Sequence, residues 1–371
     1  MPGCDDDMLD RGDFVDSDDE HEVEEASEDP ERYVEGLYYP ICIGEILVNQ
    51  YRIEHKLGHG GFSTVWMAYD ILGKTDVALK IMTPGRPGDR EYEMQREIIK
   101  VVHRTSHLTL YQNTFSLRGS HGTHRVLVLP LQGPNLRDYQ RQNQLPTGYL
   151  SSANIMYSLL PIDRSSATAK YQYIGRPKKM PLYPDLWKAG ELVMPMQVHE
   201  VLIGDDISLG DFGLAIKSGT PVSQKLQSPL IYCAPERMHN HGPTFATDMW
   251  SYMCIFAQLY MGYNLFHGAT SSLIVSSMIQ ALGPFPATWR GTYETGGACD
   301  NQWYDEGCER IPSMTLENKV ARHRPDADPV ERELVLSVLR KGLSYLPENR
   351  LTASQLLEDN SFKALMDIYR L

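Results

Sequence analysis

The sequence predicts an α+β protein in two parts, a small β-rich lobe followed by a larger and mainly helical lobe. Short runs rich in β-branched and aromatic residues, joined by glycine turns, occupy most of residues 51–131. From about residue 205 onward, apolar residues recur with helical spacing. The chain has 371 residues, 42% of them hydrophobic, which is enough to build a separate core in each lobe.

The acidic residues are concentrated at the start of the chain. Residues 1–32 hold fifteen of the 48 Asp and Glu but only two of the 35 Lys and Arg, so the remainder is balanced in charge. This start lacks apolar periodicity, and we expect residues 1–32 to form a disordered, solvated tail. The alternative is a contact for a basic partner. The chain has no basic footprint for nucleic acid.

Residues 33–132 are assigned to the small lobe. Gly58–Gly61 and Gly73–Lys74 supply turns between strands, and EYEMQREIIKVV has the apolar spacing of a helix. The expected strands span residues 51–56, 62–69, 75–81, 110–117 and 125–131, with the helix at 91–102.

Residues 133–371 are assigned to the large lobe. Its expected helices span residues 246–262, 271–281, 330–343 and 352–367, and Asp248 is expected to cap the first of them. Residues 160–204 contain several prolines and the basic run GRPKKMP, which indicates an insert or long loop. Glu236 and Arg350 are candidates for a buried ion pair between distant segments.

The chain lacks the signals of a secreted, metal-binding or membrane protein. Its six cysteines form no CxxC or other metal spacing, and no apolar stretch follows a basic start. The longest apolar run, residues 249–266, is interrupted by polar residues and is typical of a buried helix rather than a membrane span. We therefore expect an intracellular protein with free thiols.

A glycine-rich turn between two strands is a candidate phosphate site. Gly58, Gly60 and Gly61 would let backbone N–H groups approach phosphate oxygens, and Val65 would cover one face of an adenine. Glycine is also common in ordinary hairpins. Lys80 ends the strand VALK, where a buried ammonium is costly unless it meets anions. We expect Glu97, on the following helix, to be its counter-charge.

Two further residues are candidates for holding Mg²⁺. Asp211 follows an expected strand at residues 206–210 and precedes Phe-Gly. A carboxylate there suits the preference of Mg²⁺ for one or two protein carboxylates together with phosphate oxygens. Asn154 would supply the second protein ligand. Asparagine alone is commonplace in loops, so this assignment depends on the rest of the set.

The ordered set of glycine-rich turn, lysine, glutamate, asparagine, Asp-Phe-Gly and Ala-Pro-Glu resembles that of the protein kinases. The stretch EDPERYVEGLYYPICIGEILVNQYRIEHKLGHGGFSTVW resembles the entrance to the SR-protein kinases, and FSTVW and GPNL are similar to fungal-type members. That family also carries a spacer before Asp-Phe-Gly, where 56 residues separate Asn154 from Asp211 here.

The resemblance implies a bilobal protein-kinase-like fold and a cytoplasmic or nuclear serine/threonine kinase involved in regulating mRNA splicing. It implies ATP and Mg²⁺ as cofactors, and basic Arg/Ser-rich proteins as substrates and partners. Lys80, Glu97 and Asp211 would be catalytic, and Asn154 and Asp211 would bind the metal. The nucleotide-binding residues would be Leu57, Gly58, His59, Gly60, Gly61, Phe62, Ser63, Thr64, Val65, Ala78 and Lys80.

The sequence departs from the family at the catalytic loop. Tyr149 stands five residues before Asn154, where the family has the catalytic Asp, and a phenol stays protonated at neutral pH. Twelve residues separate Leu136 from Tyr149, where the family has two helices, so the large lobe would lack part of its core. Asp138 and Asp163 have the wrong spacing to substitute for the missing Asp.

Three interpretations of this gap remain open. The chain is a kinase that is active when a missing segment is present, an ATP-binding pseudokinase that acts as a scaffold, or a shortened chain that folds poorly. Loss of a whole helix favours an omitted exon over a selected pseudokinase, because a selected pseudokinase usually keeps its core.

Overall fold

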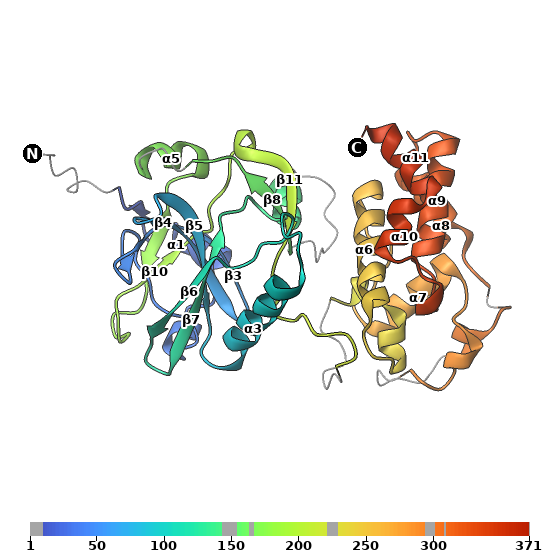
Figure 1. Cartoon of the computed structure of the whole chain (residues 1–371), viewed down its shortest axis with the longest axis horizontal. Coiled ribbons are helices and arrows are strands. Elements are labelled where there is room, and N and C mark those ends of the chain that lie inside the picture. The colour runs from blue at the N-terminus through green and yellow to red at the C-terminus, as the bar shows by residue number, and fades with distance from the viewer. Residues whose placement is uncertain are drawn as a thin grey trace, which may run out of the picture. The chain divides into compact units, whose positions relative to one another are not determined.

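The computed structural model describes residues 10–142, 154–162, 167–220, 229–293, 301–307 and 309–370. They divide into two compact units (Figure 1). Unit 1 comprises Met1–Leu136 with Asn154–Ala215, and unit 2 comprises Arg137–Ala153 with Ile216–Leu371. The α+β prediction is confirmed. The units differ from the expected division at residue 132, because Asn154–Ala215 belongs to the β-rich unit rather than to the helical one.

Unit 1 is built on a six-stranded antiparallel sheet with the order β2-β3-β4-β5-β7-β6. The β4–β5 pairing runs without a register shift from Ser63↔Met82 to Asp70↔Thr75. The five expected strands are present within a few residues of their predicted bounds. The strands are β2 Ile46–Leu47, β3 Tyr51–Gly60, β4 Ser63–Asp70, β5 Thr75–Met82, β6 Asn113–Arg118 and β7 Thr123–Pro130.

Alternation along β5 gives the sheet two different faces. Leu79 points to a core that includes Trp66, Val126, Ile41 and Val193. That core therefore draws on the segment before the sheet and on the 160–204 insert, which together cover one face. The next residue along the strand, Lys80, points to the opposite face.

The segment that precedes the sheet is folded onto unit 1. It forms β1 Asp13–Phe14, α1 Glu20–Ala26 and α2 Glu31–Val34, and the side chains of Val23 and Tyr33 are buried. The expectation that residues 1–32 form a solvated tail is therefore wrong for residues 10–32, and residues 1–9 lie outside the described range.

The partner of this acidic segment is the chain's own insert. The insert contains α5 Ala167–Ile174, β9 Lys178–Pro181 and β10 Glu191–Val193, of which α5 and β10 are labelled in Figure 1. Strand β1 pairs with β9 in parallel. Arg176 donates to Asp13 at 2.8 Å through both Nε and Nη2. The charges of the basic GRPKKMP run are thus matched within the chain, which explains why residues 160–204 are not simply an irregular loop of the large lobe.

Ion pairs of buried lysines connect the acidic segment and the insert to the sheet. Lys170 of α5 reaches Glu54 at 2.8 Å and Asp76 at 2.5 Å, on β3 and β5. Lys56 of β3 pairs with Glu28, which lies between α1 and α2. A buried ammonium needs such a partner, because the loss of hydration is otherwise uncompensated. None of these contacts was predicted from the sequence.

The sheet is followed by α3 and the insert is flanked by a second strand pair. Helix α3 spans Arg86–Val101, which is five residues more at its start than expected. Pro87 at its first turn is the signal that marks this start. Strand β8 Ile155–Leu159 pairs antiparallel with β11 Ile203–Leu209.

Unit 2 is helical, and the four expected helical regions are present. Trp250, Met253, Val335 and Leu339 lie in its buried core. The α-helices in this part of the chain are α4 Leu136–Gln142, α6 Phe245–Met261, α7 Ser271–Leu282, α8 Leu316–His323, α9 Pro329–Gly342, α10 Ala353–Glu358 and α11 Asn360–Tyr369. Short 3-10 helices lie at Glu200–Leu202 in unit 1 and at Leu230–Tyr232, Pro235–His239, Ala287–Trp289, Asn301–Tyr304, Pro312–Met314 and Pro347–Asn349 in unit 2.

Helix caps correct two details of the prediction. The region 352–367 is two helices, because Asp359 accepts from the N–H groups of Ser361 and Phe362 and starts α11. Helix α6 is capped by Thr244, which forms a capping box with Thr247. Asp248 is therefore not the N-cap.

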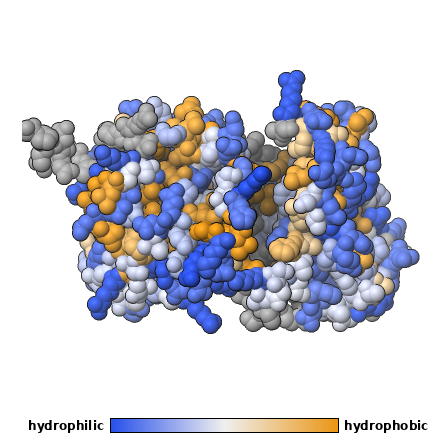
Figure 2. All heavy atoms as spheres, viewed as in Figure 1, coloured by the Kyte–Doolittle hydropathy of each residue, from blue (hydrophilic) through white to orange (hydrophobic). Residues whose placement is uncertain are grey.

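Polar side chains cover most of the face of each unit in Figure 2, and apolar side chains gather there in smaller patches. Among the described residues, no helix combines the length and the apolar character needed to cross a bilayer.

Candidate functional site

Strand register places Lys80 in a row that crosses four strands of unit 1. Gly58 of β3 lies opposite Val65 of β4, Val65 lies opposite Lys80 of β5, and Lys80 lies opposite Leu127 of β7. Cross-strand neighbours point to the same face of a sheet, so these side chains share the face opposite Leu79. Helix α5 of the insert lies over another part of that face, where Tyr171 and Ile174 pack with Met67. The glycine turn and the lysine are therefore brought together, as predicted.

Lys80 is held between two carboxylates from different parts of unit 1. Its ammonium donates to Glu91 Oε1 at 2.9 Å and Oε2 at 2.8 Å, and to Asp211 Oδ1 at 2.8 Å. Burial acts to lower the pKa of Lys80, but the charges and hydrogen bonds of Glu91 and Asp211 outweigh it and the pKa is raised. The lysine is therefore a fixed positive charge.

The prediction that Glu97 is the counter-charge of Lys80 is wrong. Glu97 pairs with Lys100 on the outside of α3, at 3.1 Å. Glu91 and Glu97 are six residues apart, about 600° around an α-helix, so they cannot occupy the same face. The error follows from starting the helix at residue 91, which made Glu97 look central.

Sequence reasoning also missed Gln95. Its Nε2 donates to Glu91 Oε1 at 3.1 Å, and its Oε1 accepts from the N–H of Tyr111 at 2.8 Å. The glutamine thus orients the carboxylate that faces Lys80. Gln95 lies four residues after Glu91, and this spacing on one helix face was the available signal.

The buried face of α3 is polar, contrary to the expected apolar one. Gly88, Glu91 and Gln95 are its buried residues, whereas Ile99 and Val101 are exposed. The ion pair with Lys80 and the bond to Tyr111 satisfy these polar groups. The half-buried Tyr92 adds apolar contact with the cluster of Ala78, Leu127 and Leu129.

Asp211 follows β11 in a backbone conformation that few residues adopt. Its φ is 59°, in the left-handed region, which Asp tolerates better than most residues. Two residues later, Gly213 lies in a crowded position. A Cβ added there would lie 3.2 Å from Glu91 Oε2 and 3.6 Å from Asp211 Oδ1. The Asp-Phe-Gly turn is thus packed directly against the lysine–glutamate pair.

The residues expected to hold a metal lie at neighbouring ends of two paired strands, Asn154 just before β8 and Asp211 just after β11. The carbonyl of Asn154 accepts from the N–H of Gly210 at 2.8 Å, so Asn154 lies beside the residue that precedes Asp211. The Asp211 side chain is 56% exposed and can accept a ligand from solvent. One carboxylate and one amide fit Mg²⁺, which takes its remaining ligands from water and phosphate. The described residues contain no cluster of three or more His, Cys, Asp or Glu suited to a metal.

The three glycines of the turn are not required by the protein's own packing. A Cβ built on Gly58, Gly60 or Gly61 would have no heavy atom within 4 Å, and none of the three has a positive φ. Crowding and backbone strain therefore do not explain them. Binding of a ligand would explain the three glycines, because without a Cβ the ligand can approach the backbone N–H groups closely.

The remaining expected nucleotide contacts fall into three groups. Ser63 and Thr64 are buried, so their backbone rather than their side chains would face a ligand. Thr64 Oγ1 accepts from Trp66 Nε1 at 3.1 Å. At the tip of the turn, His59, Gly60, Gly61 and Phe62 are exposed. Leu57, Val65 and Ala78 form an apolar floor with Leu129 and Leu131.

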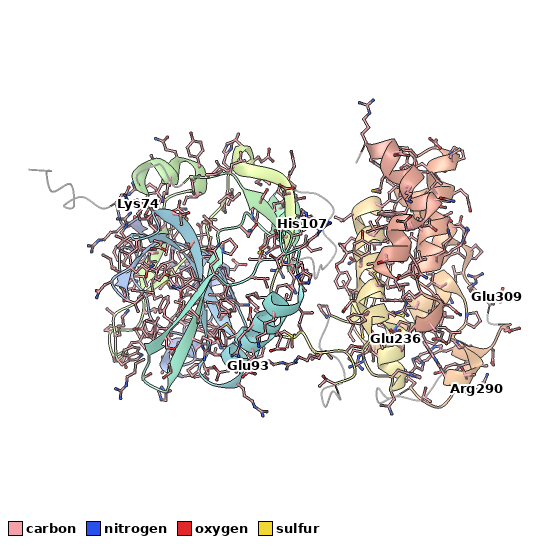
Figure 3. All side chains as sticks on the ribbon, in the orientation of Figure 1. Lys74, Glu93, His107, Glu236, Arg290 and Glu309 are labelled. Carbon is pink, nitrogen blue, oxygen red and sulfur yellow. The ribbon has the colours of Figure 1, made fainter. Side chains whose placement is uncertain are left out.

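The predicted ion pair between Glu236 and Arg350 is confirmed in unit 2. Arg350 binds the carboxylate with two parallel bonds of 2.9 and 3.0 Å, and both side chains are buried (Figure 3 labels Glu236). Arg350 also donates to the backbone of Ser344 and Ala246. The pair ties the start of α6 and the end of α9 to the Ala-Pro-Glu segment.

The structure does not define the geometry of the catalytic loop. Tyr149 and Asp163 lie outside the described residues. Asp138 lies on α4, where Arg137 Nε donates to it at 3.3 Å. No described residue of unit 2 can therefore be assigned as a base.

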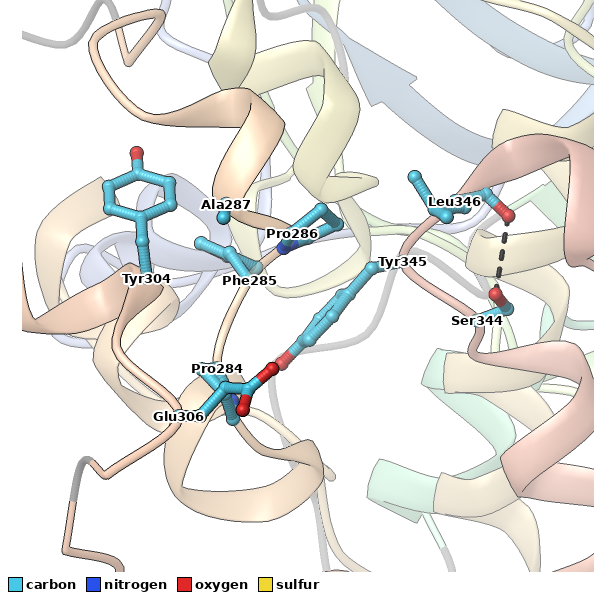
Figure 4. A pocket seen from close by; sticks show the side chains of 9 residues that line it. All are labelled: Pro284, Phe285, Pro286, Ala287, Tyr304, Glu306, Ser344, Tyr345 and Leu346. Carbon is cyan, nitrogen blue, oxygen red and sulfur yellow. Dashed lines mark hydrogen bonds between the residues drawn. The ribbon is translucent and has the colours of Figure 1, made fainter.

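Unit 2 also contains a cavity of about 390 Å³ (Figure 4). It is lined by residues 284–287, Tyr304, Glu306 and residues 344–346. Its lining includes no lysine, arginine or histidine and none of the residues predicted to bind the nucleotide or the metal. We do not assign the phosphate chemistry to it.

Comparison with known proteins agrees with these features. The protein kinase domain family matches residues 195–362. The serine/threonine-protein kinase SRPK of Physarum polycephalum is 35% identical over 412 aligned residues, covering 94% of this chain and 92% of that protein. A serine/threonine protein kinase of Aspergillus fumigatus is 25% identical over 353 residues, covering 87% of each.

Shorter and structural matches point the same way. SRSF protein kinase 3 of Mus musculus is 34% identical over 120 residues, which is 30% of this chain and 21% of that protein. The crystal structure of a kinase domain shares the fold with a TM-score of 0.61 at 18% identity, covering 88% of this chain and 99% of that chain. The chain therefore belongs to the serine/threonine protein kinases, in the SR-protein kinase family.

Proposed function

We propose that unit 1 binds ATP with Mg²⁺, and that the chain is a kinase of the SR-protein type whose substrates are serines in Arg/Ser-rich proteins. The observation that carries the nucleotide part is the contact of one ammonium, that of Lys80, with Glu91 and Asp211 under a glycine turn. Substrates of this kind would place the protein in the cytoplasm, the nucleus or both.

The charges of the site suit a metal-bound triphosphate. Two carboxylates face one ammonium, so the triad carries a net charge of −1 and attracts a divalent cation. Mg²⁺ held by Asp211 and Asn154 would neutralise the phosphates and bridge them to the protein. Lys80, already oriented by Glu91, would meet the α- and β-phosphates.

The apolar floor would receive the adenine. Val65 and Ala78 lie on the same face as Lys80, because the pairs Val65↔Lys80 and Met67↔Ala78 are two register positions apart. Leu57 and Leu131 flank them. A flat aromatic base would bury apolar surface there while its triphosphate extends towards Gly58–Gly61.

Phosphoryl transfer by this chain is expected to be slow. Tyr149 is a poor replacement for a carboxylate that orients the substrate hydroxyl and accepts its proton, and general-base catalysis contributes about 10²–10⁴-fold. The alignment with the Physarum kinase spans 412 positions, more than the 371 residues here, so it opens gaps in this chain. A segment omitted between Leu136 and Asn154 would account for some of these gaps.

A nucleotide-binding scaffold is the second candidate, and Tyr149 is the observation that favours it. In that case the chain would hold ATP and bind basic, Arg/Ser-rich proteins without modifying them. Both candidates require nucleotide binding, so only phosphate transfer separates them.

The test measures transfer from γ-labelled ATP to an Arg/Ser-repeat peptide by the wild-type chain, Lys80→Ala and Lys100→Ala. Lys100 is an exposed lysine on α3 and serves as the matched control. A kinase is supported if transfer is lost in Lys80→Ala only. ATP binding without transfer identifies the scaffold, and absence of ATP binding in the wild-type chain rules out both. Sequencing transcripts across codons 136–150 for a form with an H-x-D loop then tests the omitted-segment explanation.

A further inference from the structure

We infer that Tyr38, outside the sheet, is a positioning residue for the glycine-rich turn and sets how tightly the site holds the phosphates of a nucleotide. This inference rests on the proposed nucleotide site. The Tyr38 hydroxyl donates to the carbonyl of Gly60 at 2.7 Å, and the tyrosine is only 3% exposed. A buried side chain thus reaches an exposed residue of the turn.

The hydrogen bond fixes more than one carbonyl. A peptide unit is planar and trans, so its C=O and N–H point in opposite directions. Holding the Gly60 carbonyl therefore directs the N–H of Gly61 away from Tyr38. At the other side of the turn, the Phe62 carbonyl accepts from the N–H of Thr83 at 2.9 Å. The turn is therefore held by hydrogen bonds on both sides, from Thr83, which follows β5, and from Tyr38.

Tyr38 is itself held by the segment that precedes the sheet. Its ring meets the Tyr33 ring edge-on at 5.6 Å, and the Arg32 guanidinium lies 5.1 Å from its centroid. Its N–H donates to the Arg32 carbonyl at 3.1 Å. Tyr38 thus has little freedom to follow the turn if the turn moves.

A second attachment links the same segment to the strand that carries the turn. The Tyr33 hydroxyl donates to Glu28, and Glu28 also accepts from Lys56 of β3. Lys56 and Gly60 are four residues apart on β3, so the segment that precedes the sheet contacts this strand at two points. Glycine residues lose the most conformational entropy when they become ordered. A turn that is ordered before binding loses less entropy when phosphate binds, so its affinity for phosphate is higher.

The insert completes the support. Val23, Tyr33 and Tyr38 form one buried cluster with Leu182 and Leu192. Leu182 and Leu192 belong to the 160–204 region, and helix α1 lies against β9 and β10. Figure 1 shows α1 beside β10. The contact of Tyr38 with Gly60 therefore depends on both additions to the sheet.

The experiment compares Tyr38→Phe with Tyr39→Phe in the full chain. Both tyrosines are buried and adjacent, but Tyr39 packs on His124 and Trp187 instead of the turn. Two quantities are measured: hydrogen exchange of amides 58–63 without nucleotide, and the ratio of MgATP to adenosine affinity. Loss of one hydrogen bond is expected to speed exchange and weaken MgATP binding about two- to tenfold in Tyr38→Phe only. Adenosine affinity should change less than about twofold.

Equal exchange in the two variants, or equal loss of MgATP and adenosine affinity in Tyr38→Phe, would overturn the inference, because a merely structural role predicts one of these. If the wild-type chain bound no MgATP, the proposed function would fail, while exchange in the nucleotide-free chain would still decide whether Tyr38 orders the turn.

Discussion

Lys80 donates to both carboxylate oxygens of Glu91, at 2.9 and 2.8 Å, and not to Glu97, which pairs with Lys100. This relationship fixes the helix that completes the site. It also gives a pair of glutamates on one helix whose roles can be compared directly.

Glu91→Gln should weaken MgATP binding by about tenfold or more, equivalent to about 1.4 kcal/mol, because Lys80 loses the charge that orients it. Glu97→Gln should leave the affinity within about twofold. Isothermal titration with MgATP measures both. Equal losses in the two variants would mean that Glu91 has no special part in nucleotide binding.

Alanine at Gly60 should separate folding from binding. Because an added Cβ would meet no atom of the protein, the thermal midpoint should stay within a few degrees or rise slightly. MgATP affinity should fall, since the Cβ would occupy space that the phosphates need. Scanning calorimetry and nucleotide titration test this, with Gly73→Ala in the β4–β5 turn as a control for binding. Unchanged affinity in Gly60→Ala would argue against phosphate under the turn.

Glu236→Gln should destabilise unit 2 strongly, by about 3–5 kcal/mol, because it leaves the buried Arg350 guanidinium without its partner charge. The variant Glu317→Gln, which loses an exposed pair with Arg340, should cost less than about 1 kcal/mol. Urea unfolding measures both. Equal losses of stability in Glu236→Gln and Glu317→Gln would mean that burial gives the Glu236–Arg350 pair no special weight.

Glu28→Gln should destabilise unit 1 by about 3 kcal/mol, since Lys56 would keep a buried charge without its counter-ion. Glu24→Gln, at an exposed position of α1, should have little effect. Urea unfolding followed by tryptophan fluorescence measures the difference; Trp66, whose ring centroid lies 4.0 Å from the Lys56 ammonium, is one of the five tryptophans that contribute. If residues 10–32 were a solvated tail, neither change would matter.

Acid should destabilise unit 1 through His55. Burial lowers the pKa of His55 from 6.5 to about 4, with weaker opposing hydrogen bonds to Lys56 and Gly175. The folded chain therefore keeps this histidine neutral, and its stability is fully present above pH 6.5 and falls as the pH drops towards 4, by about 3 kcal/mol. His55→Gln should flatten the dependence between pH 6.5 and 4, unlike the exposed His103→Gln. Parallel pH curves for His55→Gln and the wild-type chain would contradict this assignment.

The sequence predicted the parts of unit 1 that depend on local pattern. Alternation and glycine turns located β3, β4 and β5, and their spacing brought Gly58 and Lys80 into one row. These features are encoded within short windows of sequence.

Other features depend on contacts between distant segments, and no local pattern indicates them. The acidic start of the chain was predicted to be a tail because its partner, the basic insert, is far away in the sequence. The ion pair between Asp13 and Arg176 is one of the contacts that join them. Glu91 and Glu97 differ only in helical phase, which depends on where α3 begins. Tyr38 is one of 21 tyrosines, and its importance lies in a single contact with Gly60.

The most direct measurement of the central claim is the affinity for ATP with and without Mg²⁺ in the wild-type chain and in Asp211→Asn. If Asp211 and Lys80 hold a metal-bound triphosphate, Mg²⁺ should tighten binding in the wild-type chain by at least about tenfold, and Asp211→Asn should remove that gain while leaving adenosine affinity unchanged. A wild-type chain that binds ATP equally well with and without Mg²⁺, or an Asp211→Asn variant with the full gain, would contradict the account.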